Sequence, residues 1–279
     1  MISILFGLTS AISWGAADFT GGLASRKTGA YRAVFYGETI GLILILVVAI
    51  LVWQPVPAWT IWALSMAAGA LGTTGLLLLY YSLTKGLMSI ATPVSALLAA
   101  LLPVVVGSFT ESPATLLTFS GFGFALAAVW LISQSEEGVK DLFAHITDLR
   151  LPLLAGVGFG LYFVLIHAAT RTATLWPMVA SRIGGVLILT LYMTVRRESW
   201  AVEKSAWRMI LLNGILDIGG NLFYVLAGQA GRLDISAVLS SLYPGSTVVL
   251  AWIFLKERLS RTQWVGIIAA LVAIVLFTL

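Results

Sequence analysis

The sequence predicts an all-α membrane protein with ten transmembrane helices, arranged as two inverted five-helix repeats. The first observation is that ten long apolar runs occupy most of the 279-residue chain. The second is composition: 59% of the residues are hydrophobic, only 10% are charged and the mean hydropathy is +1.00, whereas a soluble domain is about 25% charged. The third is that the first half of the chain resembles the second half at a constant shift.

Each apolar run has the length that a membrane-spanning helix requires. A hydrocarbon core about 30 Å thick needs roughly 20 helical residues to cross it. The first run has neither a basic leader nor a small-residue cleavage pattern, so we expect a retained helix rather than a signal peptide. We expect the ten helices at 2–22, 31–52, 60–84, 88–108, 114–133, 152–170, 174–196, 205–229, 234–254 and 261–278. The predicted units are a first repeat (1–133), a linker (134–150) and a second repeat (151–279).

The repeat appears when the chain is compared with itself at a shift of 145 residues. The matched pairs are Gly15 with Gly160, Arg26 with Arg171, Trp62 with Trp207, Gly75 with Gly220, Gly86 with Gly231 and Gly121 with Gly266. Because five spans is an odd number, the second copy must enter the membrane from the opposite side. Inverted repeats around a central site are typical of secondary transporters, although a duplicated bundle could also serve as a passive scaffold.

Basic residues predict the orientation. The loops after the odd-numbered helices hold 13 Lys and Arg near helix ends, and those after the even-numbered helices hold only Arg171 and Arg232. The positive-inside rule therefore places both termini outside a cell (inner) membrane that the chain crosses many times. The same placement of bases explains the pI near 9.5 without a nucleic-acid partner.

The stretch from Leu239 to Gly266 resembles the C-terminal repeat motif of EamA-type carriers in the drug/metabolite transporter superfamily. The specific features are the spacing from Pro244 to Glu257, the Glu-Arg-Leu turn and the Gln-Trp-x-Gly that follows. Trp14-Gly15 resembles the family's signature in the first helix. The first half departs from the pattern at 110–113, where Thr-Glu-Ser-Pro replaces a Gly-Glu-Arg turn. Family members commonly have both termini inside, which conflicts with the charge count.

The resemblance implies export or exchange of small polar or amphipathic metabolites, amino acids among them, through a cavity lined by both repeats. The superfamily also includes nucleotide-sugar and drug carriers, so a lipid or amphiphilic-drug flippase, a multidrug carrier and a channel remain alternatives. No metalloprotease, nucleophile-elbow or phosphate-loop motif occurs in the sequence, so we expect no enzyme activity and no cofactor or metal. The expected partners are a small-molecule substrate, membrane lipids and a coupling proton or counter-substrate. The oligomeric state is not readable from the sequence.

The central polar stripe of the eighth predicted helix is the best substrate-binding candidate. Asp217, Asn221 and Tyr224 follow one another at +4 and +7, which places all three on one helical face. Low dielectric favours the neutral form of a carboxyl group, so Asp217 is also a candidate for proton coupling. The alternative is a structural role, with Asp217 bonded to hydroxyls of a neighbouring helix.

Glu38 and Arg182 lie about two turns into corresponding helices of the two repeats. Charges inside a bilayer are costly and should face a cavity or a partner. We therefore expect these two residues to pair, either at the substrate-binding site, with Glu38 also coupling protons, or as a structural ion pair that fixes the packing of the halves.

Aromatic residues supply the remaining substrate-binding candidates. Tyr80, Tyr81 and Trp14 could stack on a substrate ring, but tyrosines near helix ends are equally often interfacial anchors. Asp18 lies one turn after Trp14, and we expect it to form a solvated salt bridge with Arg26 or Lys27.

His167 and the helix prolines complete the candidates. His167 lies near the end of the sixth predicted helix and is a candidate proton relay, because imidazole titrates near neutral pH. The alternative is a hydrogen-bonded core or surface histidine. Pro93, Pro103 and Pro244 are expected to interrupt their helices and to free backbone groups toward the cavity.

Overall fold

The computed structural model describes residues 1–84, 88–111, 113–133, 149–256 and 259–278. Within these ranges the chain is almost entirely helical and contains no strand. The elements are α1 (Ile2–Thr28), α2 (Ala30–Leu51), α3 (Trp59–Thr84), α4 (Met88–Thr110), α5 (Leu116–Ser133), α7 (Arg150–Ala169), α8 (Leu175–Val195), η2 (Lys204–Ala206), α9 (Trp207–Ala230), α10 (Leu233–Ser240), α11 (Tyr243–Leu250), η3 (Ala251–Leu255) and α12 (Arg261–Thr278). Most of the predicted linker, 134–148, lies outside the described residues.

The predicted membrane-spanning segments are present. Nine segments of the described chain are long and apolar enough to cross a membrane, and α4, with 23 residues, is the tenth by length. Large apolar side chains such as Ile43 (55% exposed) and Leu271 (58%) remain on the outer surface. A soluble protein would bury such a surface, whereas lipid accommodates it. The chain is therefore a multi-pass membrane protein.

One predicted helix is divided in two. In place of a continuous helix over 234–254, α10 ends at Ser240 and α11 begins at Tyr243. Pro244 lies in the first turn of α11, where a missing N–H costs little. The expectation for Pro93 and Pro103 was wrong, because α4 continues through both positions without a break.

The helix packing has the symmetry that the repeat predicts. Helices α1 to α5 correspond in order to α7, α8, α9, the α10–α11 pair and α12. Helix α1 packs on α9 as α3 packs on α7, α2 packs on α9 as α3 packs on α8, and α4 packs on α7 as α1 packs on α11. The pairs α2–α8, α4–α10 and α5–α12 join equivalent helices. Two antiparallel copies related by a pseudo-twofold axis give this arrangement.

Matched glycines make equivalent contacts in the two repeats. A Cβ added at Gly15 would lie 2.6 Å from the carbonyl oxygen of Tyr243, and one added at Gly160 would lie 3.3 Å from that of Leu98. Leu98 and Tyr243 are themselves 145 residues apart. Small residues such as glycine permit close approach of helices in lipid, so the glycine matches fit shared packing in the two repeats.

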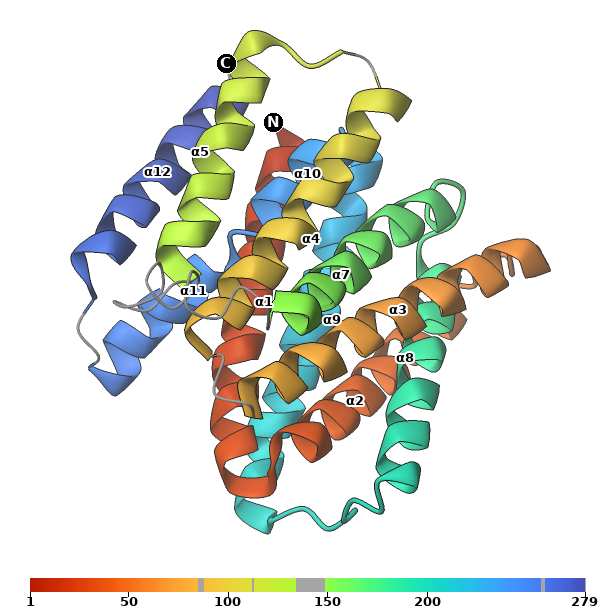
Figure 1. The fold of residues 1–279 in the computed structure, drawn as a ribbon. Coiled ribbons are helices and arrows are strands. Elements are labelled where there is room, and N and C mark those ends of the chain that lie inside the picture. The colour runs from red at the N-terminus through yellow and green to blue at the C-terminus, as the bar shows by residue number, and fades with distance from the viewer. Residues whose placement is uncertain (85–87, 112, 134–148, 257–258, 279) are drawn as a thin grey trace.

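The bundle has two distinct ends. Figure 1 shows the N-terminus of α1 and the C-terminus of α12 at one end, which we name the terminal end. The opposite end carries the loop between α8 and α9, with Arg196, Arg197 and Lys204, and the last turn of α1, with Arg26 and Lys27. We name it the basic end.

Candidate functional site

A cavity of about 570 Å³ lies at the centre of the bundle and is lined by helices of both repeats. Its inner wall includes Trp14, Tyr162 and Asn221, whereas Ser25, near the end of α1, and Gln263, in the first turn of α12, line its other extreme. Both of these helix ends lie at the basic end. The cavity therefore extends from the middle of the bundle to the basic end, and its size suits a small organic molecule.

A buried charged triad joins three helices at this cavity. The Arg182 guanidinium on α8 forms ion pairs with Glu38 on α2 and with Asp217 on α9. The side chains of Arg182, Glu38 and Asp217 are 7%, 18% and 29% exposed, and all three line the cavity. The expected pairing of Glu38 with Arg182 is present, and Asp217 joins it. Two carboxylates compensate the one guanidinium, which is how a buried charge is tolerated.

The polar stripe of α9 continues from the triad toward the terminal end. Asn221 donates from Nδ2 to the Asp217 carbonyl oxygen at 2.8 Å, and its Oδ1 accepts a hydrogen bond from the Tyr162 hydroxyl on α7. Asn221 and Tyr162 therefore form a bridge between α9 and α7 in the cavity wall. Tyr162 was not among the residues predicted from the sequence.

Asp18 has a different environment from the expected one. It lines the cavity, and none of the ion pairs found within the described ranges joins it to Arg26 or Lys27. Its neighbour one turn later, Gly22, also lines the cavity, and a Cβ built there meets no atom within 4 Å. The predicted solvated salt bridge was wrong, because Asp18 faces the open space between the helices.

An aromatic layer closes the cavity toward the terminal end. The Trp14 ring packs against Phe163 and Tyr224, with ring centroids 5.6 and 5.9 Å apart. Tyr224 is 1% exposed and donates from its hydroxyl to the Phe163 carbonyl oxygen at 2.9 Å. Trp14 lines the cavity, whereas Tyr224 lies behind the wall and is not among the described lining residues.

Neither of the other two predicted tyrosines is found at the cavity among the described side chains. Tyr81, on the last turn of α3, is 45% exposed and does not line the cavity. The side chain of Tyr80 lies outside the described part of the structure. So do Glu257 and Arg258 of the family motif.

A second cavity, of about 560 Å³, lies at the terminal end. Polar side chains from several loops and helix ends line it, including Gln54, Glu111, His167, Arg171 and Gln229. His167 therefore lies in this second cavity and not beside Asp217 or Glu38. Residues of the aromatic layer, Phe163 and Tyr224, precede His167 and Gly228 by one turn on α7 and α9, so this layer separates the two cavities.

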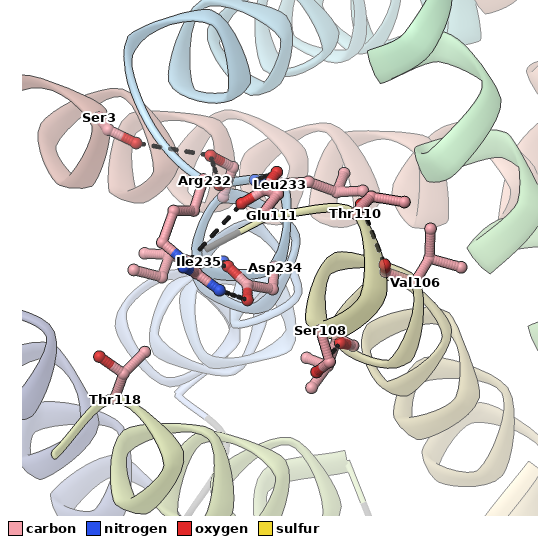
Figure 2. Close-up of polar contacts among 12 residues, drawn as sticks. Ser3, Val106, Ser108, Thr110, Glu111, Thr118, Arg232, Leu233, Asp234 and Ile235 are labelled. Atoms are coloured by element: carbon pink, nitrogen blue, oxygen red, sulfur yellow. Dashed lines mark hydrogen bonds and ion pairs between the residues drawn. The ribbon is translucent and has the colours of Figure 1, made fainter. Parts of the chain in front are cut away.

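Three charged residues hold the repeats together at the terminal end, and we name Glu111, Arg232 and Asp234 the terminal latch (Figure 2). The Glu111 carboxylate, directly after α4, accepts a hydrogen bond from the Leu233 N–H at 2.8 Å and lies 3.7 Å from Arg232 Nε. Arg232 donates from Nη2 to the fully buried Asp234 at 2.6 Å. Burial raises the pKa of Glu111 above its ordinary value, although the Leu233 N–H opposes the shift.

Comparisons with known proteins agree with this architecture. A model of the EamA-like transporter family matches residues 1–134 and 149–279, so each match covers one repeat. An uncharacterized protein of Methanocaldococcus jannaschii is 27% identical over 135 residues, which are 48% of this chain and 97% of that protein. A solved crystal structure superimposes with a TM-score of 0.76 and 18% identity, covering 99% of this chain and 96% of the other. With two matched repeats, ten spans and a shared fold, the chain belongs to the EamA-like transporter family.

Proposed function

We propose that this protein is a secondary transporter that exports or exchanges a small polar or amphipathic organic solute by alternating access around the central cavity. The observation that carries the proposal is a cavity with charged and polar side chains in a largely apolar wall, built by both repeats, that reaches the basic end and is closed toward the terminal end. Two similar halves around such a cavity can rock so that it opens to either side. Membership of a transporter family supports the same function.

The proposed substrate-binding residues are those that line the cavity at mid-membrane. Trp14, Asn221 and Tyr162 supply an aromatic face and hydrogen-bonding groups, and Glu38, Arg182 and Asp217 supply charge. Asp217 and Glu38 are the proposed coupling carboxylates, because each can exchange its contact with Arg182 for a proton. Amino acids are one substrate class that the family resemblance implies, with a proton or a counter-substrate as coupling partner.

We propose that the basic end faces the cytoplasm, which leaves both termini outside and makes the present conformation open to the inside. Cysteine tags at either terminus test this orientation, because the native chain contains no cysteine. Labelling of intact cells by an impermeant thiol reagent is the expected result. If labelling required disrupted cells, both termini would lie inside and the proposed orientation would be reversed. The rest of the proposal would be unaffected.

Solute exchange across a liposome membrane tests the transport function itself. Protein reconstituted into liposomes should exchange an internal solute for its labelled external copy, and Asp217→Asn should abolish the pH dependence of that exchange. A matched control is Glu203→Gln, which removes one carboxylate at an exposed position of the basic end. Exchange that is absent for amino acids, amines, sugars and organic acids alike would contradict the proposal. Exchange of labelled phospholipid alone would favour the flippase.

A further inference from the structure

The charges that line the central cavity are unequal in number. Asp18, Glu38 and Asp217 are acidic, whereas Arg182 is the one basic residue among the described residues of the lining. Both ion-pairing partners of Arg182 are members of this set. The described part of the wall therefore carries an excess of negative charge when its carboxyl groups are ionised.

Arg182 is not disposed to bind an anion. Its Nη1 faces Glu38 and its Nη2 faces Asp217, and only 7% of its side chain is exposed. A substrate carboxylate or phosphate would have to displace one of these two partners and leave it without a counter-charge in a region of low dielectric. That exchange is unfavourable, because an unpaired buried charge is far more costly than a paired one.

Asp18 offers its charge to the cavity instead. Its side chain is exposed to the cavity space, and none of the hydrogen bonds or ion pairs established for the described residues neutralises it. The space beside Gly22, one turn away, is open. A group that enters the cavity from the basic end can therefore reach this carboxylate directly.

Aromatic rings lie one helical turn deeper in the cavity than Asp18. Trp14 precedes Asp18 by four residues on α1 and lines the same cavity, as do Tyr162, Phe163 and Tyr243. The edge of Tyr243 packs on Trp14, with ring centroids 6.4 Å apart. Aromatic faces attract ammonium groups and accommodate apolar bodies, so this wall suits an organic cation for a reason independent of the carboxylates.

We propose that the cavity binds organic amines with an aromatic body, and that Asp18 is the specificity-determining residue that selects their positive charge. This inference rests on the proposed transport function and narrows its substrate class. The ammonium group lies at Asp18 and the body of the solute lies against Trp14. Zwitterionic amino acids are poorer ligands, because the described part of the cavity lining offers no free cation for their carboxylate.

Four solutes that share a benzyl group and differ in charge test the proposal: 2-phenylethylamine, 2-phenylethanol, phenylalanine and phenylacetate. We expect titration calorimetry of the purified protein to show 2-phenylethylamine binding at least about tenfold more tightly than the other three. Asp18→Asn should remove this preference, and Asp18→Glu should restore it. Glu203→Gln, the matched loss of an exposed carboxylate, should preserve it. Thermal unfolding of each variant establishes that it is folded.

Several outcomes would overturn the proposal: failure of 2-phenylethylamine to bind, equal or tighter binding of phenylacetate or phenylalanine, or an amine preference that survives in Asp18→Asn. Liposome exchange with the same four solutes separates this failure from failure of the proposed function. Exchange of the anion or the zwitterion without exchange of the amine would contradict the charge selection and retain the transporter. Absence of exchange for all four, and for the wider panel above, would contradict both.

Discussion

The two ends of the bundle differ in how they connect the repeats. At the terminal end the repeats are joined above the cavity by the terminal latch and by the hydrogen bond from Ser3 Oγ to the Ala227 carbonyl oxygen at 2.8 Å. At the basic end the connections run along one side, where Arg32 and Tyr36 of α2 donate to the carbonyl oxygens of Ala201 and Trp200. The cavity lies beside these contacts and reaches the basic end.

Helices related by the pseudo-twofold axis therefore make different contacts at the two ends. At the shift of 145 residues, Glu111 corresponds to Lys256 and Asp234 corresponds to Ser89. The sequence therefore does not repeat the acidic pair of the terminal latch at the equivalent positions of the basic end. A transporter with inverted repeats needs two conformations of similar energy, and polar contacts that differ between the two ends influence which end closes.

The largest expected effect comes from the charged triad between the two ends. Arg182→Leu leaves Glu38 and Asp217 without their counter-charge, and we expect it to lower the free energy of unfolding by about 3–5 kcal/mol. Unfolding in detergent measures the loss, with the exposed Arg196→Leu as control. Adding Glu38→Gln and Asp217→Asn to Arg182→Leu should recover part of the stability. Equal stability of Arg182→Leu and Arg196→Leu would show that the triad does not hold the helices together.

Breaking the terminal latch should open the closed end. Glu111→Ala removes the acceptor of the Leu233 N–H and the partner of Arg232, and we expect a shift of about 1–3 kcal/mol toward the conformation open at the terminal end. The readout is reaction of a single cysteine at the cavity residue Ser181 with an impermeant thiol reagent added from the terminal side. Glu203→Ala is the matched control at the basic end. Unchanged labelling in Glu111→Ala would exclude the latch as a barrier.

Acidification should have a similar but smaller effect. The pKa of Glu111 is raised by burial, with Asp234 adding to the shift and Arg232 and Arg171 opposing it. Above that raised pKa the carboxylate is ionised and pairs with Arg232, and below it the neutral form loses this attraction.

Labelling of Ser181→Cys from the terminal side should therefore increase as the pH falls through the raised pKa of Glu111. His167 lines the same cavity and also gains charge on acidification, so Glu111→Gln serves as the control for the glutamate. The pH dependence should be largely lost in Glu111→Gln. If labelling kept its full pH dependence in Glu111→Gln, a group other than Glu111 would be responsible for it.

The smallest effect is expected within the aromatic layer. Tyr224→Phe removes one hydrogen bond, to the Phe163 carbonyl oxygen, and keeps the ring against Trp14. We expect about 0.5–1.5 kcal/mol in favour of opening at the terminal end, measured by the same cysteine reaction. An effect larger than that of Glu111→Ala would place the main barrier in the aromatic layer rather than in the latch.

Much of the fold could be predicted from the sequence because membrane spans are specified by local composition. A long apolar run is enough to predict a helix, because in lipid a segment must satisfy its backbone hydrogen bonds internally. The match of Gly15 with Gly160 also has a physical basis, since both glycines permit equivalent close contacts. The break between α10 and α11 required more than hydropathy, although Pro244 marked its position.

The site was less accessible to sequence reasoning because it depends on which helix faces meet. The stripe of Asp217 and Asn221 was visible, and extending it by one turn would have included Asn213, which also lines the cavity. Asp18 shared a helical face with Trp14, but the nearby Arg26 and Lys27 suggested a solvated salt bridge. Tyr162 had no periodic signal of its own. The pairing of Glu111 with the start of α10 joins positions more than 120 residues apart, which no local pattern reveals.

Two distances measured across the same protein test alternating access most directly. Spin labels at Thr115 and Thr172 report the terminal end, and labels at Lys27 and Arg261 report the basic end; each pair joins the two repeats at exposed positions. On addition of a transported solute, or in Glu111→Ala, we expect the terminal pair to move apart while the basic pair moves together. Distances that stay fixed at both ends, or that increase at both ends together, would contradict alternating access around the central cavity.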